Sequence, residues 1–321
     1  MRRMTVFFLP FLLLFLAGCS DQSTSPEMDL TASYGKPDKP PKPPKPGSEP
    51  ANPEIAIDSD GLVVADADGG NKTMIYDPGR FFNPSWFTDG TGTEGDPYRI
   101  LISAGISGQI PMEIVEVVVD NGVPRAGEIS EVLPDPWYVH AEISPSGSEL
   151  VAIYVEPDYF HHSVRLVNLQ AGTYETLYEA TGEDEVFRPE WNPQGTKIAF
   201  FENVRQFPEE TTLWIMDVST RVMKEVLTFT AVSGSPRGVS WGRTMDQLVF
   251  DYDGTIYHVI LDGNLDPIGD PVPLGNGRGA VWAPDDSRIA YEYRNTTYIK
   301  TFPPARKDQR ILGGWWPDWR R

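Results

Sequence analysis

Apolar and polar residues recur in a fixed order from about residue 84 onward. Each copy has an aromatic or apolar anchor, a turn rich in Pro, Gly and Asp, and a short β-prone run, which is the pattern of a hairpin. The clearest copies are Trp191–Phe200 (WNPQGTKIAF) and Trp282–Tyr291 (WAPDDSRIAY), and weaker copies begin at Trp86, Ile143 and Trp241. A further strand is expected after most copies, over residues 163–169, 212–218, 255–261 and 297–302. Four short strands in each repeat are typical of a propeller blade.

The last copy, Trp315–Trp319 (WWPDW), ends after its first half. The missing half lies at the other end, where Ile55–Ile57 matches the Ile-Ala-Phe position and is followed by β-prone runs at 61–66 and 72–76. Pairing the C-terminal strand with these N-terminal strands completes a blade and removes two exposed edges. We therefore predict an all-β fold, a six-bladed β-propeller over residues 51–321 with a split closing blade.

The run Trp-x-Pro-x-Gly-x-Lys-Ile-Ala-Phe, followed by a strand ending in Asp-x-Asp-Gly, resembles the repeat of TolB-type six-bladed propellers. It is also similar to the propeller halves of prolyl-oligopeptidase-like peptidases. The resemblance covers essentially all of 51–321 and implies the fold, with little about function. TolB carries a separate α/β domain before its propeller, and the peptidases carry a hydrolase domain after theirs. Here a stalk replaces the first and nothing replaces the second, so we expect neither a role identical to TolB nor a peptidase.

Residues 1–18 combine a basic start, an apolar run and small residues before a cleavage point, as in a secretory signal peptide. The sequence Leu-Ala-Gly-Cys19 resembles the bacterial lipobox, which implies cleavage before Cys19 and a diacylglyceryl group on its sulfur. Cys19 is the only cysteine in the chain. The alternative is an ordinary signal peptide with an incidental cysteine. Because Ser20 rather than Asp follows, the resemblance implies a lipid-anchored envelope protein of the outer membrane, facing the periplasm.

Residues 19–50 lack apolar periodicity, and 36–46 read KPDKPPKPPKP. This composition favours an extended polyproline II stalk. Its lysines are interpreted as solubilising spacer charges, with contact to anionic lipid or to an SH3-like domain as the alternatives. The whole chain has 46 acidic and 27 basic residues, a formal charge of −19. That charge argues against nucleic acid as the main partner.

No common catalytic signature occurs in the chain: there is no Gly-x-Ser-x-Gly, no His-Glu-x-x-His and no phosphate-binding loop. The run Asp66-Ala-Asp68-Gly-Gly-Asn71 invites a calcium interpretation but lacks the glycine and glutamate positions of an EF-hand, so a hairpin turn is expected. His161 and His162 could hold a transition metal with a carboxylate, but neighbours on a strand point to opposite faces. We therefore expect no catalytic residue, no metal and no cofactor.

Long connections concentrate on one side of one propeller face, over the third and fourth blades. Aromatic, arginine and histidine residues in these loops are of types that are common at protein interfaces. The candidate partner-binding residues are Tyr159, Phe160, His161, His162, Arg205 and Phe207. The alternative interpretation is that such loops only cap a hydrophobic rim.

Four basic residues precede successive anchors by three or four positions: His140, Arg188, Arg237 and Arg278. Equivalent positions in successive blades point toward the central axis, so these residues form a candidate anion site at the channel mouth. The planar guanidinium group suits a carboxylate or a phosphate. The alternative is that each arginine pairs with a nearby acidic residue, such as Glu190 or Asp184.

Together these patterns predict a lipid-anchored envelope protein whose propeller is a non-catalytic module that binds an envelope protein. The alternative is a carbohydrate-binding or metal-dependent sugar-cleaving propeller that uses its channel for an acidic glycan. A pure scaffold without a saturable ligand is the third interpretation.

Overall fold

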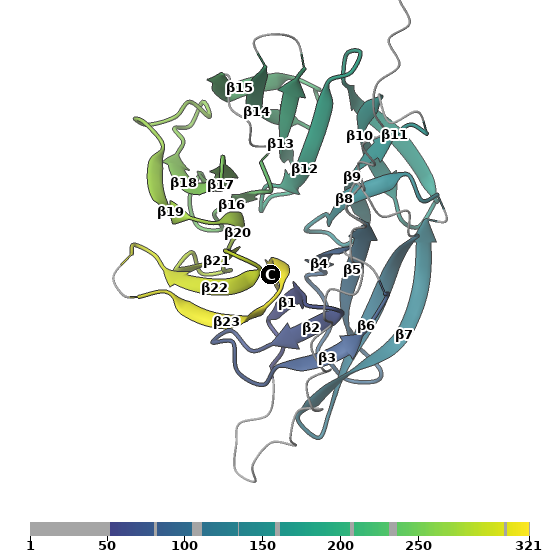
Figure 1. Cartoon of the computed structure of the whole chain (residues 1–321). Coiled ribbons are helices and arrows are strands. Elements are labelled where there is room, and N and C mark those ends of the chain that lie inside the picture. Colours follow the sequence, from purple (N-terminus) through teal and green to yellow (C-terminus); the bar gives the residue numbers. More distant parts are fainter. Residues whose placement is uncertain are drawn as a thin grey trace, which may run out of the picture. The chain divides into compact units, whose positions relative to one another are not determined.

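The computed structural model describes residues 52–79, 82–104, 111–133, 135–157, 161–205, 209–230, 236–304 and 307–320. These residues form strands and no helix, and the strands are arranged as six four-stranded antiparallel blades around a central axis (Figure 1). No helix that is long and apolar enough to cross a membrane occurs among them. The predicted six-bladed propeller is therefore confirmed.

The strands of each blade follow one another outward from the axis, with one exception at the closing blade. The closing blade has the order β24 (Trp315–Trp319), β1 (Ile55–Asp58), β2 (Leu62–Ala65), β3 (Thr73–Tyr76). The second and third blades are β4 (Phe82–Trp86), β5 (Tyr98–Ala104), β6 (Met112–Asp120), β7 (Val123–Leu133), and β8 (Tyr138–Ile143), β9 (Glu149–Val155), β10 (His162–Asn168), β11 (Thr173–Glu179). The fourth, fifth and sixth are β12 (Glu185–Trp191), β13 (Lys197–Val204), β14 (Glu210–Asp217), β15 (Met223–Thr230); β16 (Val239–Trp241), β17 (Gln247–Tyr252), β18 (Thr255–Ile260), β19 (Val272–Asn276); and β20 (Arg278–Trp282), β21 (Arg288–Glu292), β22 (Thr296–Thr301), β23 (Gln309–Gly313).

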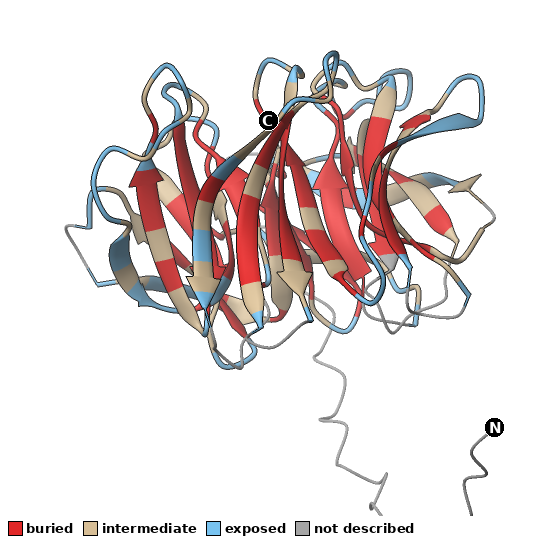
Figure 2. Ribbon diagram, turned by 90° about the horizontal axis from the view of Figure 1, so that it is seen from above, coloured by how far each residue is buried: buried red, intermediate tan, exposed pale blue. Residues whose placement is uncertain are grey.

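The repeated anchors are the last or nearly the last residues of the innermost strands, and all are at most 1% exposed. They are Trp86, Ile143, Trp191, Trp241, Trp282 and Trp319. Each packs into an apolar cluster that includes residues of a neighbouring blade; Trp241, for example, shares its cluster with Phe187 and Phe201 of the fourth blade. The core of the propeller therefore lies between the blades, and the buried segments run along the strands in Figure 2.

The second strand of each blade is covered on both sides by neighbouring blades, so both of its faces are apolar. In β13 the run Ile198–Phe201 is entirely buried. The outer strand β11 is instead largely exposed, because nothing packs beyond it. This difference in coverage explains why the Ile-Ala-Phe run is continuously apolar, whereas polar and apolar residues mix along the outer strands.

A polar side chain before the anchor of one blade ties that blade to the next. The Oγ atoms of Ser85 and Ser240 each accept a hydrogen bond from the anchor N–H of the following blade, at 3.2 Å. At the closing blade Asp318 takes this place, and its Oδ2 accepts the N–H of Trp86 at 2.8 Å. Strand β24 pairs with β1, with Ile55 opposite Trp319, so the predicted split blade is confirmed.

The chain has two kinds of loop, one on each face of the ring. We call the face that carries the turns between second and third strands the loop face; the innermost strands begin there. The turns of this face are short in the fifth blade, at 253–254, and in the sixth, at 293–295. The connection from the third to the fourth blade is also short, because β11 ends at Glu179 and β12 begins at Glu185.

Candidate functional site at the channel mouth

The predicted partner-binding loops fall partly outside the described residues, namely Tyr159, Phe160 and Phe207. Of the others, His161 is exposed and His162 is buried at the start of β10. Arg205 forms an ion pair with Glu185, and its N–H donates to Asp184. The structure therefore ties Arg205 to its own blade and leaves the arc over the third and fourth blades a prediction.

The channel-mouth residues are brought together by a repeated irregularity of the innermost strands. Three residues before the anchor, His140, Arg188 and Trp316 have φ values of 49°, 51° and 45°, and Gly279 has 54°. The pairing register of these strands with their neighbours shifts at the same place. Each shift is a β-bulge, a feature that bends the strand and re-aims a side chain.

Non-glycine residues with positive φ are strained, and such residues concentrate where a function needs the geometry. In the fifth and sixth blades glycine occupies the equivalent position. A Cβ on Gly238 would lie 3.2 Å from Cα of Gly279, so the two innermost strands approach closely there. In these two blades the basic residue lies one position earlier than the glycine, at Arg237 and Arg278.

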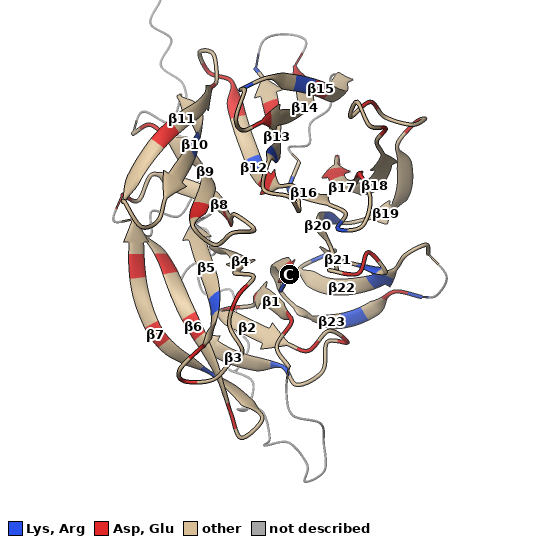
Figure 3. Ribbon diagram, turned by 180° about the vertical axis from the view of Figure 1, so that it is seen from behind, with Lys and Arg blue, Asp and Glu red and all other residues tan. Residues whose placement is uncertain are grey.

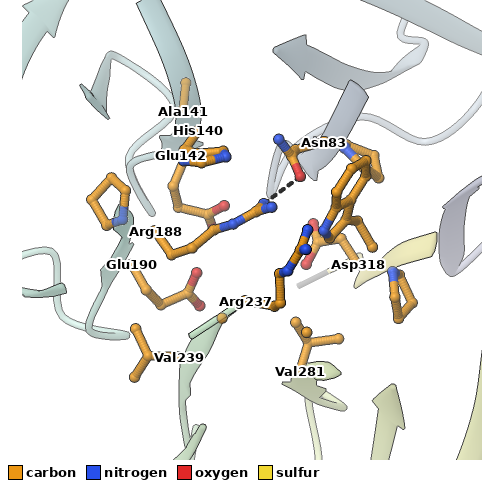
Figure 4. Close-up of a pocket in the computed structure, with 16 residues that line it drawn as sticks. Asn83, His140, Ala141, Glu142, Arg188, Glu190, Arg237, Val239, Val281 and Asp318 are labelled. Atoms are coloured by element: carbon orange, nitrogen blue, oxygen red, sulfur yellow. Dashed lines mark hydrogen bonds between the residues drawn. The ribbon is translucent and has the colours of Figure 1, made fainter. Parts of the chain in front are cut away.

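The bulged residues surround a narrow cavity of about 70 Å³, which we call the throat (Figure 4). The part of its wall nearer the loop face, which we call the upper wall, consists of Asn83, His140, Arg188, Arg237, Gly279 and Trp316. The guanidinium of Arg188 donates to Oδ1 of Asn83, a residue of the second blade, and lies 5.1 Å from the ring centre of Trp316. Arg188 is therefore held by groups from two other blades.

A wider hollow of about 430 Å³ adjoins the throat on the loop face, and we call it the vestibule. It shares Arg237, Gly279 and Trp316 with the throat. Its remaining wall includes Arg278, Tyr293, Arg294 and Trp315. Figure 3 shows basic segments where β16 and β20 begin, near the axis. The volume lies within the range of about 300–1,000 Å³ that is usual for small-ligand sites.

The arginines of the vestibule, Arg237, Arg278 and Arg294, are exposed. Within the described part of the chain, the ion pairs of arginine are those of Arg99, Arg125, Arg165, Arg205 and Arg221. None of the channel-mouth arginines is among them. Asp184, one of the acidic partners that the sequence suggested, accepts the N–H of Arg205 instead, and pairing with Glu190 stays the alternative.

Deeper in the throat the wall becomes acidic. Glu142, Glu190 and Asp318 line it two residues beyond His140, Arg188 and Trp316 on the same strands. Both sets line the same cavity, so each of these three strands presents both layers to the channel. The throat thus has a basic and aromatic layer toward the loop face and an acidic layer below it.

A buried carboxyl group supports the basic layer from behind. Asp251 accepts the N–H of Gly279 at 2.7 Å and the N–H of Arg237 at 3.0 Å, joining the beginnings of the innermost strands of two blades. Burial raises its pKa to about 7, although these hydrogen bonds and the charges of Arg188 and Arg237 oppose the rise. Asp58 has the same role at the closing blade, where it accepts the N–H of Phe82 and burial raises its pKa to about 7.

Burial also sets the charge of the two best-covered bases in the throat. It lowers the pKa of Arg188 to about 9, so the guanidinium stays protonated at neutral pH. It lowers the pKa of His140 well below its usual value, and the charges of Arg188 and Arg237 act in the same direction. His140 is therefore a neutral imidazole, and its Nδ1 has no hydrogen-bond partner among the described residues.

The structure places three of the four predicted channel-mouth residues, His140, Arg188 and Arg237, around one throat. Arg278 lies further out, in the vestibule. The predicted set of channel-mouth residues did not include Asn83 and Trp316, although each lies three residues before an anchor. Arg294 lies in a turn between β21 and β22, and no repeat position marks it.

The candidate calcium run forms the turn between β2 and β3, and its side chains bond within that turn. Asn71 donates to Asp66 at 2.6 Å, and the N–H of Gly70 donates to Asp68 at 2.7 Å. Across the described ranges, no group of three or more His, Cys, Asp and Glu residues could hold a metal ion.

Comparison with known proteins supports the fold. Neither a protein-family profile nor a curated protein sequence matches the chain. A chain of the nidogen/laminin complex is similar over 84% of this chain and 99% of its own, with 8% identity and a TM-score of 0.61. The protein assigned as TolB in Agrobacterium tumefaciens matches 83% of this chain and 91% of its own, with 11% identity and a TM-score of 0.55. TolB from Acinetobacter baumannii covers 81% of this chain and 67% of its own, with 14% identity and a TM-score of 0.47.

Identities this low show a common fold and leave function to the site itself. The described part of the chain is a six-bladed β-propeller with the fold of TolB-like propellers.

Proposed function

We propose that this chain is a lipid-anchored protein of the bacterial cell envelope whose propeller is a non-catalytic binding module. In this proposal the vestibule holds an anionic group of an envelope protein. Cys19 carries the lipid, and residues 20–50 act as a stalk that holds the propeller away from the membrane. The lipid on Cys19 and the outer-membrane location rest on the sequence alone.

One observation carries the proposal: Arg237, Arg278 and Arg294 line a single hollow, exposed and without an ion pair among the described residues. Three positive charges in one place repel one another. One carboxylate, that of Glu292, lines the same hollow, but its Oε1 accepts the N–H of Asn295 at 2.6 Å, and a single negative charge does not balance three positive ones. An anionic ligand would relieve the repulsion, and guanidinium groups bind carboxylates with paired hydrogen bonds.

The groups around the vestibule favour recognition over chemistry. Arginine, tryptophan and tyrosine dominate the energetically important positions of protein interfaces. His140, the most obvious candidate for acid–base work, is uncharged and buried in the wall of the throat. Binding of a partner is therefore the function that the described geometry supports best.

An acidic glycan is the second candidate, since Trp315 and Trp316 beside arginines would suit a sugar ring that bears a carboxylate. Such a ligand would make the propeller a carbohydrate-binding or sugar-cleaving protein. The same experiment distinguishes the two candidates if proteins and glycans are both analysed.

The test is affinity capture from a detergent extract of the native envelope with the immobilised protein. The variant Arg237→Gln/Arg278→Gln/Arg294→Gln should lose a stoichiometric protein partner. The matched control, Arg125→Gln/Arg221→Gln/Arg310→Gln, makes the same change of net charge at other sites and should retain it. Equal capture by all three proteins would contradict the proposal, and an enriched glycan without a protein would support the second candidate.

A further inference from the structure

The wall of the throat changes the sign of its charge with depth, and this limits which anions fit. An anion that arrives from the loop face first meets Arg278 and Arg294, then Arg237, then Arg188. Beyond Arg188 it meets carboxyl groups of the acidic layer, Glu142, Glu190 and Asp318. A carboxyl group offers an anion no positive charge, and an ionised one repels it. The channel therefore attracts an anionic group down to the basic layer and no further.

Because an anion is held at the basic layer, the throat favours a ligand that has its one negative charge at its end. A polyanion that ran through the channel would place its second charge against the acidic layer. A ligand whose only anionic group is at its end avoids that contact, because the part that follows stays in the vestibule. The charge pattern thus favours a chain end over a threaded acidic polymer.

The size of the throat limits the group further. Its volume of about 70 Å³ is far below that of the vestibule and below the range usual for small-ligand sites. So narrow a space suits a carboxylate on a slender stem better than it suits a sugar ring. The vestibule, at about 430 Å³, has room for the residues behind that carboxylate.

One buried polar atom also indicates a ligand at this depth. His140 is 7% exposed and lines the throat, and its Nδ1 has no partner among the described residues. Figure 4 shows it beside Arg188. Leaving such an atom unpaired in a buried site is unfavourable. A carboxylate held by Arg188 would accept a hydrogen bond from His140 in the tautomer that is protonated at Nδ1.

We infer that the vestibule and throat together bind the free C-terminal carboxylate of an extended polypeptide. This inference rests on the proposed function and specifies its ligand. The carboxylate enters the throat at Arg188 and His140. Arg237 lies at the junction of the two cavities, and the last side chains of the peptide lie against Trp315 and Tyr293 in the vestibule.

The test uses the full-length protein in detergent and two pools of random N-acetylated tetrapeptides without Asp or Glu. One pool ends in a free carboxylate and the other in an amide, so the C-terminus is the sole carboxylate. Retained peptides are identified by mass spectrometry, and the dissociation constant of the best one is measured in both forms. We expect amidation to weaken binding by about 10- to 100-fold, which corresponds to a charged hydrogen-bonded contact.

Variants locate the effect. Arg237→Gln should weaken binding of the free acid and leave the amide almost unchanged, and Arg310→Gln, on the outer strand β23, should change neither. Thermal denaturation of each variant shows whether the fold is intact. Amide and acid forms that bind equally, or a complete lack of retained peptides, would overturn the inference, as would trigalacturonate that competes for the site more tightly than the peptides do.

The two failures are distinguishable. If capture from the envelope extract still depends on the three vestibule arginines while peptide binding shows no dependence on the C-terminal carboxylate, the proposed function stands and this inference falls. If capture is also independent of those arginines, both fall.

Discussion

His140 and Arg188 hold a left-handed backbone conformation that an L-residue adopts only at a cost of roughly 1–2 kcal/mol. Their strands must bulge to turn these side chains into the throat. Glycine has no such cost, so replacement by glycine should be more stable than replacement by alanine at both positions, by about 1 kcal/mol. In a regular strand the order is the reverse, because glycine loses more backbone entropy than alanine on folding.

Urea denaturation of the four variants measures this difference, and alanine removes the same side-chain contacts as glycine. Val139, the residue before His140 in β8, has no positive φ and serves as the control site. There Val139→Gly should be less stable than Val139→Ala. If alanine were also the more stable replacement at His140 and Arg188, the bulges would carry no strain.

The repeat spacing was sufficient to predict that His140, Arg188 and Arg237 share one site, because positions at a fixed distance from an anchor face the same axis. It could not show the acidic layer, since that requires knowing that residues two positions further on also face the channel. The position of Arg294 could not be predicted from the repeat spacing, for a different reason. It lies in a turn, and which turn lies over the mouth depends on how the blades close around the axis.

At the scale of the element, the closing strand β24 (Trp315–Trp319) pairs with a strand from the other end of the chain and not with the strand next to it in sequence. It pairs with β1, more than 250 residues earlier in the chain. Trp319 is 1% exposed and packs with Ile55 and Ile57. We expect Trp319→Ala to lower the free energy of unfolding by about 3–5 kcal/mol, the usual cost of removing a buried aromatic residue.

Deletion of residues 315–321 should cost more than Trp319→Ala, because it also exposes the edge of β1 and removes the hydrogen bond from Trp86 to Asp318. Chemical denaturation followed by tryptophan fluorescence measures both. Trp315→Ala, on the same strand but partly exposed, is the matched control and should cost far less. A deletion that leaves stability unchanged would mean that β24 does not close the ring.

The strands were predictable at this scale because each repeat encodes its own hairpin, with the anchor and the turn in fixed order. The expected strands at 255–261 and 297–302 correspond to β18 and β22 within one residue at each end. The bulges were not predictable. They arise where an innermost strand must pass close to its neighbour at the axis, as Gly238 and Gly279 do, and that proximity is a property of the closed ring.

At the scale of the whole molecule, Asp58 and Asp251 join neighbouring blades, and burial raises the pKa of each to about 7. A carboxyl whose folded pKa is raised stabilises the fold fully below its unfolded pKa of about 4, and this contribution is lost as the pH rises to about 7. His140 and His258, whose pKa values are lowered by burial, act in the opposite direction below about 6.5. The total pH profile therefore mixes the two effects.

The difference between wild type and Asp251→Asn isolates the carboxyl group. The stability of the wild type relative to this variant should fall as the pH rises from about 4 to about 7, by at most about 4 kcal/mol, and then stay constant. Denaturant unfolding at a series of pH values measures it. Asp217→Asn is an opposite control, since hydrogen bonds lower the pKa of Asp217 to about 2: the advantage of the wild type over this variant should be constant above about pH 4 and be lost as the pH falls below that value. A wild-type advantage over Asp251→Asn that grew with rising pH would show that Asp251 is ionised in the folded ring, and that the charges of Arg188 and Arg237 outweigh its burial.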